Sequence, residues 1–260
     1  MNKSIDSEVK LLTQFSALLE DVAHRPYPLS AKPWIMTQTW SDLLFAHWRV
    51  SARKMRDLVP QRLELDTYDG DAWIGVVPFN MTNVGLRHLP LIPGASSSLE
   101  LNVRTYVRCQ GTPGVYFFSL DAENPLFVWS ARLTYYLPYY MAVMSQKKSS
   151  GCYEYASERR HPASPLASFK ARYKPIADAA VSAPGSIEHF LTERYCLFAV
   201  SGKSLYRGEV HHKPWPLQRA EAEIEMNTMC APLGLQIEDS HGLFHFAARL
   251  DTLEWPLQKT

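Results

Sequence analysis

The first apolar pattern along the chain has helical spacing. Between Ser7 and about Ala23, apolar side chains recur three and four positions apart, as in an amphipathic helix, and Pro26 then stops the pattern. The residues are Val9, Leu11, Leu12, Phe15, Leu18, Leu19 and Val22. We expect residues 1–35, this helix and a Pro-rich link, to pack on the outside of the main domain. An arm used in self-association is the alternative.

Beyond residue 35 the pattern changes to alternation, which indicates β-strands. An Asp-Gly step at Asp69 and Gly70 is a strong hairpin signal, and it lies between two alternating segments, 63–68 and 72–81. The strands predicted in this way cover 43–50, 63–68, 72–81, 98–109, 115–122, 152–159, 168–175 and 244–250.

Three helices interrupt the strands. One begins after Ser51 and ends before Pro60, one has Asn124 as its N-cap with Pro125 in the first helical position, and one has Ser186 as its N-cap. No linker divides the chain after residue 35. We therefore predict a single mainly β (α+β) domain over residues 36–260, with antiparallel strands closed or nearly closed and a few peripheral helices.

Composition excludes several classes of function. The chain has 27 Lys and Arg against 26 Asp and Glu, a net charge of +1, so no broad basic surface is expected to bind nucleic acid. The four cysteines form no C-x-x-C pair and the N-terminus lacks an apolar run, which favours the cytoplasm. The most apolar window is interrupted by Pro138 and is too short to span a membrane.

Nucleotide-binding and nucleophile motifs are also missing from the sequence. It contains no G-x-G-x-x-G, no P-loop and no G-x-S-x-G, so no cofactor is predicted. The adjacent His211 and His212 point to opposite faces of a strand, and His241 and His245 lie about 13 Å apart on a strand. We therefore predict no metal site.

The strand predicted over 98–109 carries the strongest candidate chemistry. Alternation places Glu100, Asn102, Arg104, Tyr106 and Arg108 on one face. This polar face meets either water or the interior of a closed sheet. In the interior, Arg104 would hold a carboxylate in a bidentate contact and Glu100 would move a proton. These two residues lie about 13 Å apart along the strand, so a ligand between them is needed to join them.

Several runs of the sequence together resemble the YqjF-like family of uncharacterised bacterial proteins. They include LLFAHWRV, LVPQRLELDTYDGDAWIGVVPFNM, ELNVRTYV, ARLTYYLPYYMA and EVHHKPWPLQRAEAEI, and they extend over residues 40–226. That family is similar in fold to acetoacetate decarboxylase. The resemblance implies a cone-shaped, mainly antiparallel β-barrel with a buried cavity, and it places the polar strand face inside.

The same resemblance identifies a departure at the catalytic position. Acetoacetate decarboxylase has a Pro-Lys-Lys run whose first lysine forms a Schiff base, and here the run reads Pro138, Tyr139, Tyr140. A phenol forms no imine and has a pKa near 10, so it serves as a hydrogen-bond donor. Glu100 matches one cavity glutamate of the family. No counterpart of the second glutamate or of the arginine is evident.

These observations lead to a preferred hypothesis and two alternatives. The protein binds a small organic acid or carbonyl compound in a buried pocket, with Glu100 and Tyr139 in catalytic positions and Arg104, Asn102, Tyr106 and Tyr140 in contact with the ligand. The first alternative is a non-catalytic interaction module that forms a homodimer. The second is a lyase that uses a different catalytic residue and no Schiff base.

Overall fold

The computed structural model describes residues 15–91, 94, 96–238 and 241–260. Most of the helix predicted at the N-terminus lies outside these residues. Its described end, Ala17–Glu20, is a short 3-10 helix. The side chains of Phe15 and Leu18 are buried there in a small cluster with Trp34, Leu253 and Trp255.

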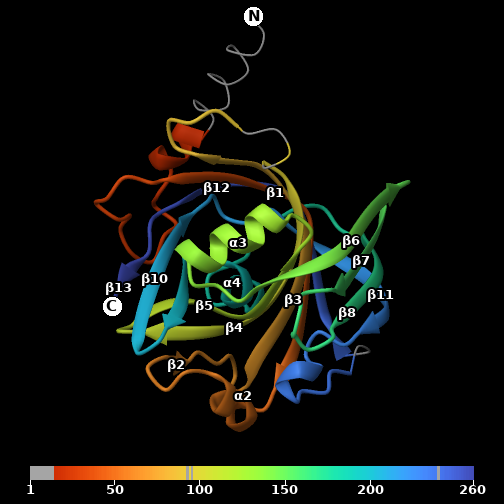
Figure 1. Ribbon diagram of the computed structural model, residues 1–260. Helices are drawn as coiled ribbons and strands as arrows, with labels where there is room; N and C mark the ends of the chain where they lie inside the picture. The colour runs from red at the N-terminus through yellow and green to blue at the C-terminus, as the bar shows by residue number, and fades with distance from the viewer. Residues whose placement is uncertain (1–14, 92–93, 95, 239–240) are drawn as a thin grey trace, which may run out of the picture.

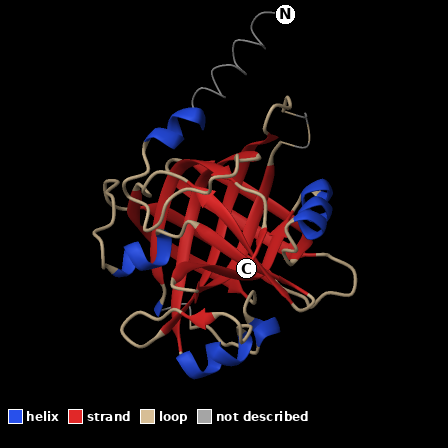
Figure 2. Ribbon diagram, turned by 90° about the vertical axis from the view of Figure 1, so that its left-hand side faces the viewer, coloured by secondary structure: helices blue, strands red, loops and turns tan. Residues whose placement is uncertain are grey.

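Strands dominate the described chain, and the helices are short. Figure 2 shows the strands gathered in the interior with the helices around them. The elements are η1 (Ala17–Glu20), β1 (Met36–Val50), α2 (Ala52–Leu58), β2 (Glu64–Leu65), β3 (Ala72–Leu86), β4 (Ser98–Cys109), β5 (Thr112–Ala122), α3 (Pro125–Thr134), β6 (Tyr139–Ser149), β7 (Cys152–Arg159), β8 (Ser168–Pro175), α4 (Ile187–Thr192), β9 (Cys196–Ser201), β10 (Ser204–His211), β11 (Leu217–Asn227), η2 (Ala231–Leu233), β12 (Leu243–Glu254) and β13 (Gln258–Lys259).

The sheet forks at two strands. One edge of β5 pairs along its length with β4, whereas the other edge is shared by β6 at 120–122 and β9 at 115–116. Strand β12 likewise pairs with β1 on one edge and with both β11 and β10 on the other. The arm β9–β10 and the arm β6–β7–β8–β11 therefore both join β5 to β12, and each closes a ring with β1, β3 and β4. Figure 1 shows the ring-like arrangement, with α3 in front of it.

The predicted strands are confirmed except that 63–68 is reduced to Glu64–Leu65, and one predicted pairing is wrong. The turn at Asp69 and Gly70 forms, with both residues at positive φ and a bridge between Tyr68 and Asp71. The segments on either side do not make a hairpin, because β1 and β4 occupy the two edges of β3, and β2 pairs with β4 beyond the end of β3. The Asp-Gly step therefore reverses the chain without joining two adjacent strands.

The predicted helices are confirmed with one shortened. Asn124 caps α3 by accepting a hydrogen bond from the backbone of Leu126, and Ser186 caps α4 in the same way through His189. Helix α4 ends at Thr192, whereas the helical prediction covered the run GSIEHFLTERYCLF as far as Phe198. Residues from Cys196 onward pair with β10 and with β5 instead, so sheet pairing overrides the local helical pattern there.

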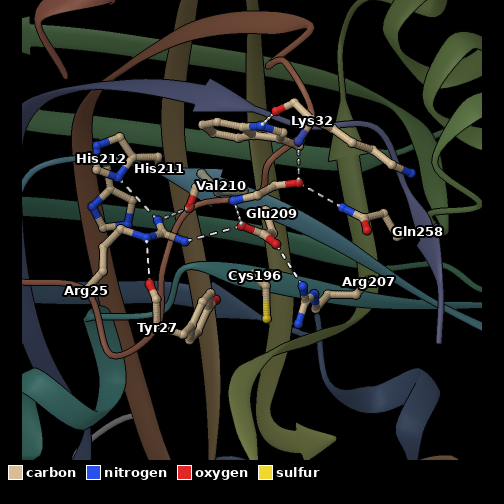
Figure 3. A network of polar contacts seen from close by, with 12 residues as sticks. Arg25, Tyr27, Lys32, Cys196, Arg207, Glu209, Val210, His211, His212 and Gln258 are labelled. Carbon is tan, nitrogen blue, oxygen red and sulfur yellow. Dashed lines mark hydrogen bonds and ion pairs between the residues drawn. The ribbon is translucent and has the colours of Figure 1, made fainter. Parts of the chain in front are cut away.

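The described part of the N-terminal segment is fastened to β10 by buried polar contacts. Arg25 donates a hydrogen bond from Nη1 to the carbonyl of Val210 at 3.0 Å and lies 3.5 Å from the Glu209 carboxylate. The same carboxylate accepts from the backbone of Ser30 at 3.1 Å and from Arg207 at 2.8 Å. Figure 3 shows Arg25, Arg207 and Glu209 converging. Because Val210 also lines the pocket described below, this segment supports the pocket wall from behind.

No helix among the described residues has the length and apolarity that crossing a bilayer requires.

A buried ion pair marks the fork of β5. Asp121 of β5 and Arg159 of β7 are 0% and 3% exposed, and Arg159 approaches the Asp121 carboxylate at 2.7 and 2.9 Å. Burial raises the pKa of Asp121 to about 6, against the opposing effect of Arg159. The pair ties the start of the longer arm to β5, and neither charge reaches water.

Removal of one partner of this ion pair should therefore lower the free energy of unfolding. We predict that Asp121→Ala lowers the free energy of unfolding by about 3–5 kcal/mol near pH 8, because it leaves the Arg159 charge buried without its partner. Urea denaturation measures this change. Glu154→Ala is the control: it breaks the exposed Arg172–Glu154 pair on β8 and β7, and its expected cost is below about 1 kcal/mol. Equal losses in the two variants would contradict the prediction.

Candidate functional site

A pocket of about 560 Å³ lies between the strands of the ring and helix α3. Its walls come from β1, β3, β4, β5, β9 and α3, and from single residues of β6, β10, β12 and α4. Most lining side chains are apolar, and a few polar groups interrupt them. The size lies within the range of about 300–1,000 Å³ typical of small-molecule sites.

Glu100 is the central polar group of this pocket. It is 4% exposed, and its Oε2 accepts a hydrogen bond from the Tyr139 hydroxyl at 2.6 Å. The Asn102 amide lies 3.5 Å from the other carboxylate oxygen. Tyr155 fixes the strand itself, since its hydroxyl donates to the backbone carbonyl of Glu100 at 2.8 Å. The structure thus brings Glu100, Asn102 and Tyr139 together on the pocket lining.

Glu254 is a second buried carboxyl in the same pocket. The sequence patterns did not predict that Glu254 lines a pocket. It is the last residue of β12, it is 7% exposed, and it lines the pocket. Its position follows from the pairing of β12 with β1, which places it opposite Met36. Among the described residues, its side chain has no hydrogen-bond partner. A glutamate at the end of an apolar strand would be expected at the surface, so only the closed ring reveals it.

The two carboxyls are poised to hold protons near neutral pH. Burial raises the pKa of Glu100 to about 7, although the hydrogen bonds from Tyr139 and Asn102 oppose the shift. Burial also raises the pKa of Glu254 to about 8, and the charge of Glu100 adds to that increase. Burial raises the pKa of Tyr139 well above its usual value, with the Glu100 charge contributing, so its hydroxyl remains a donor. Carboxyls with such values can both donate and accept protons at pH 7.

Arg104 lies on the same strand as Glu100 and Asn102, and alternation places all three on the face that lines the pocket. The register shift between β4 and β5 at this point leaves the extra residue, Phe118, on β5 and not on β4. The guanidinium lies 5.4 Å from the ring centre of Phe45 and donates from Nη2 to the backbone carbonyl of Leu191 at 3.4 Å. Its neighbour Gly75 is needed there, because an added Cβ would lie 3.0 Å from the ring of His47.

Three buried polar atoms of the pocket lining have no hydrogen-bond partner among the described residues. They are the Asn102 amide oxygen, the Arg104 Nε and the Trp215 indole nitrogen. The first accepts a hydrogen bond and the other two donate one. Buried polar groups are usually paired, so this acceptor and these two donors are available for hydrogen bonds with a polar group inside the pocket.

Two residues of the predicted ligand-binding set lie outside the lining. The Tyr106 hydroxyl is 2.6 Å from His47 Nε2, and its fully buried side chain is not part of the lining. Tyr140 turns away from Tyr139, as adjacent strand residues do, and its ring lies 4.2 Å from the Arg159 guanidinium and meets His161 edge-on. Neither residue lines the pocket.

The histidines singled out in the sequence have separate surroundings. His211 Nε2 is 2.7 Å from the Leu18 carbonyl, whereas His212 Nδ1 is 2.7 Å from the Lys213 carbonyl. Burial lowers the pKa of each to about 4. Within the ranges that the structure describes, no group of three or more His, Cys, Asp or Glu side chains is placed to hold a metal ion.

Comparison with known proteins identifies relatives by sequence and by structure. A family model described as DUF2071, uncharacterized conserved protein, matches residues 37–251. The chain is 47% identical over 226 residues to "Uncharacterized protein YqjF" of Bacillus subtilis (strain 168), a match that covers 87% of this chain and 93% of that protein.

Two solved structures show the same fold at low identity. The enduracididine biosynthesis enzyme MppR, complexed with pyruvate, has a TM-score of 0.59 at 11% identity and covers 90% of this chain and 92% of its own. Acetoacetate decarboxylase from Legionella pneumophila subsp. pneumophila str. Philadelphia 1 has a TM-score of 0.57 at 11% identity, with 94% and 95% covered. The expected acetoacetate-decarboxylase-like fold is thereby confirmed.

The two pocket carboxyls should make stability depend on pH. Between pH 4.5, where free glutamate titrates, and about pH 7–8, the folded state holds protons on Glu100 and Glu254 that the unfolded chain has released. Folding stability therefore falls as pH rises through this range. Buried neutral histidines such as His47, whose pKa is lowered, act in the opposite direction but only below about pH 6.5.

Glu254→Gln tests this dependence in the window where only the carboxyls act. We predict that the variant is more stable than the wild type at pH 8 by on the order of 1 kcal/mol, and that its loss of stability between about pH 6.5 and 8 is smaller. Urea denaturation at several pH values measures both quantities. Glu223→Gln, which changes an exposed glutamate of β11, should leave the profile unchanged. The same slope in wild type and Glu254→Gln would refute the prediction.

Proposed function

The chain belongs to the DUF2071 family, and we propose that it binds a small organic acid or carbonyl compound in the pocket beside Glu100. The observation that supports this most directly is the set of unpaired buried polar atoms on Asn102, Arg104 and Trp215 within a mostly apolar lining. The pyruvate held by MppR, a protein of the same fold, supports the same class of ligand.

Arg104 is proposed to bind the acid group of the ligand. Its Nε has no partner among the described residues, Nη2 makes a long contact to Leu191, and the guanidinium lies 5.8 Å from the ring centre of Tyr106. A guanidinium forms paired hydrogen bonds with a carboxylate, which are stronger than neutral ones. The apolar surroundings, including Phe45 at 5.4 Å, lower the local dielectric and strengthen this contact.

Glu100 and Tyr139 are proposed to act together on a carbonyl group. With Glu100 ionised, the Tyr139 hydroxyl donates its proton to the carboxylate at 2.6 Å. When Glu100 takes up a proton, the Tyr139 hydroxyl no longer has an anion to bind and can donate to a ligand oxygen. Because the pKa of Glu100 is raised to about 7, both states are populated at neutral pH. Proton transfer by Glu100 and stabilisation of a developing oxyanion by Tyr139 are the chemistry that this pair supports.

A lyase-type reaction without a Schiff base is the second candidate, and the raised pKa of Glu100 favours it. The lining residues of the described chain include no lysine, and Lys147 and Lys148 are exposed near the β6–β7 turn. We expect borohydride reduction with acetoacetate to leave every lysine unmodified, as mass spectrometry would show. A lysine adduct would restore the Schiff-base mechanism.

Arg104→Ala is the direct test of binding. We predict that it weakens the binding of pyruvate or acetoacetate at least tenfold, the loss expected when a charged hydrogen-bond donor is removed. Arg104→Lys keeps the charge but loses the planar pair of donors, so its affinity should lie between those of the wild type and Arg104→Ala. Isothermal titration calorimetry provides the affinities, and crystals soaked in the same acids should show density beside Arg104.

The control for this test lies on the same strand. Arg108 is exposed, pairs with Asp66 at 2.8 Å and does not line the pocket. Arg108→Ala should therefore leave the affinity unchanged. An equal loss in both variants, or unchanged binding in Arg104→Ala, would rule out the proposed role of Arg104.

A further inference from the structure

We propose that the ligand of this pocket carries an extended apolar body behind its acid group, so that the preferred compounds are amphipathic acids and not acids as short as pyruvate. This inference rests on the proposed function and specifies its ligand class. Three observations carry it: the order of polar and apolar groups along the pocket, the size of the pocket, and the exposed apolar side chains that line its other end.

The strand register places the acid-binding group at one end of the lining. On β3, the lining residues extend from Val77, which pairs with Asn102, to Leu86, which pairs with Met36. Arg104 lies two pairs beyond Asn102, opposite Gly75. The charged donor and Leu86 therefore lie at opposite ends of the pocket wall. A ligand whose acid group contacts Arg104 extends past Glu100 towards Leu86.

The wall along this route is mostly apolar. Phe79, Met81 and Val84 follow one another on β3 after Val77, and α3 contributes Phe127 and Ala131 on the lining. Trp40 of β1 also lines the pocket and meets the Phe79 ring edge-on at 5.9 Å. Glu254, opposite Met36, is the charged exception. An alkyl or aromatic group that packs on these apolar side chains loses contact with water, which is favourable in proportion to the buried area.

The volume of about 560 Å³ is larger than the shortest acids require. Pockets of this size hold ligands of drug-like dimensions. A three-carbon acid bound at Arg104 would leave most of the apolar wall without a partner. The volume thus fits a ligand with an apolar chain or ring and not only a carboxyl head.

Exposed apolar residues line the pocket at its opposite end. Leu86, Leu89 and Leu126 are 54%, 55% and 64% exposed and nevertheless belong to the lining. Residues that face both the pocket and the solvent mark its mouth. Clusters of exposed apolar side chains are typical of ligand-binding grooves, and a ligand with an apolar end would cover part of them.

A homologous series of acids tests the proposal. The probes are straight-chain α-keto acids from pyruvate to α-ketodecanoate, titrated by calorimetry against the full chain. We expect affinity to rise about fourfold for each added methylene, the factor that corresponds to about 0.8 kcal/mol per buried CH₂, until the chain reaches the mouth. Ala131→Phe, which adds bulk to the lining, should end the rise at a shorter chain.

Two substitutions on one helix provide a matched control. Leu126→Asp places a charge at the mouth and should weaken the longest acids at least fivefold while the affinity for pyruvate stays constant. Leu133→Asp changes a residue of α3 that is 74% exposed and lies outside the lining, and it should alter neither.

The outcomes separate this inference from the proposed function. If affinity does not change with chain length but is lost in Arg104→Ala, the inference about the apolar body is overturned and the acid-binding site stands. If alcohols of the same lengths bind as tightly as the acids, the apolar route stands and the acid-binding role of Arg104 fails. If no member of the series binds, both proposals fail.

Discussion

The shared edge of β5 is the constraint from which the rest of the architecture follows. A strand edge offers one row of hydrogen-bonding groups, and here β9 takes the residues at one end of that row while β6 takes those at the other. The two arms must therefore diverge, and they meet again only at β12. Side chains on the strands between the two forks face an interior that no single sheet could enclose, and the pocket occupies part of it.

The fork also explains why charged groups are stable inside. Asp121 lies on β5 in the stretch that pairs with β6, and Arg159 at the end of β7 lies close enough to neutralise it. One step further along the wall, Glu100 has no cation beside it and is instead held by the hydroxyl of Tyr139. Two buried acids on neighbouring strands thus have different partners: one is matched by an opposite charge, and the other is left free to exchange its proton.

Local sequence patterns predicted helices and strands well, because these elements depend on residues that are neighbours in sequence. Alternation identified the strand that carries Glu100 and Arg104, and the caps at Asn124 and Ser186 were found because a capping side chain bonds within its own turn. The resemblance to a known family placed the polar face of that strand inside the closed sheet, which alternation alone left undecided. The pairing of β2 with β4 was missed, since a turn signal indicates that the chain reverses but not which strand it meets.

Alternation predicted pocket-lining residues only where one strand presents them together. Glu100, Asn102 and Arg104 share a face and line the pocket, but the same alternation included Tyr106, which lies outside the lining beside His47. Glu254 was missed because its place in the pocket depends on a partner more than two hundred positions away, Met36. No periodicity within a short window contains that information.

The pairing of β1 with β12 joins the beginning of the described chain to its end. During synthesis, the wall that carries Met36 and Trp40 leaves the ribosome long before the strand that completes it. Contacts between such distant segments form slowly, because a long loop must close first. Before β12 pairs, the wall has an open seam where Glu254 belongs, so the pocket is complete only after segments more than two hundred positions apart have come together.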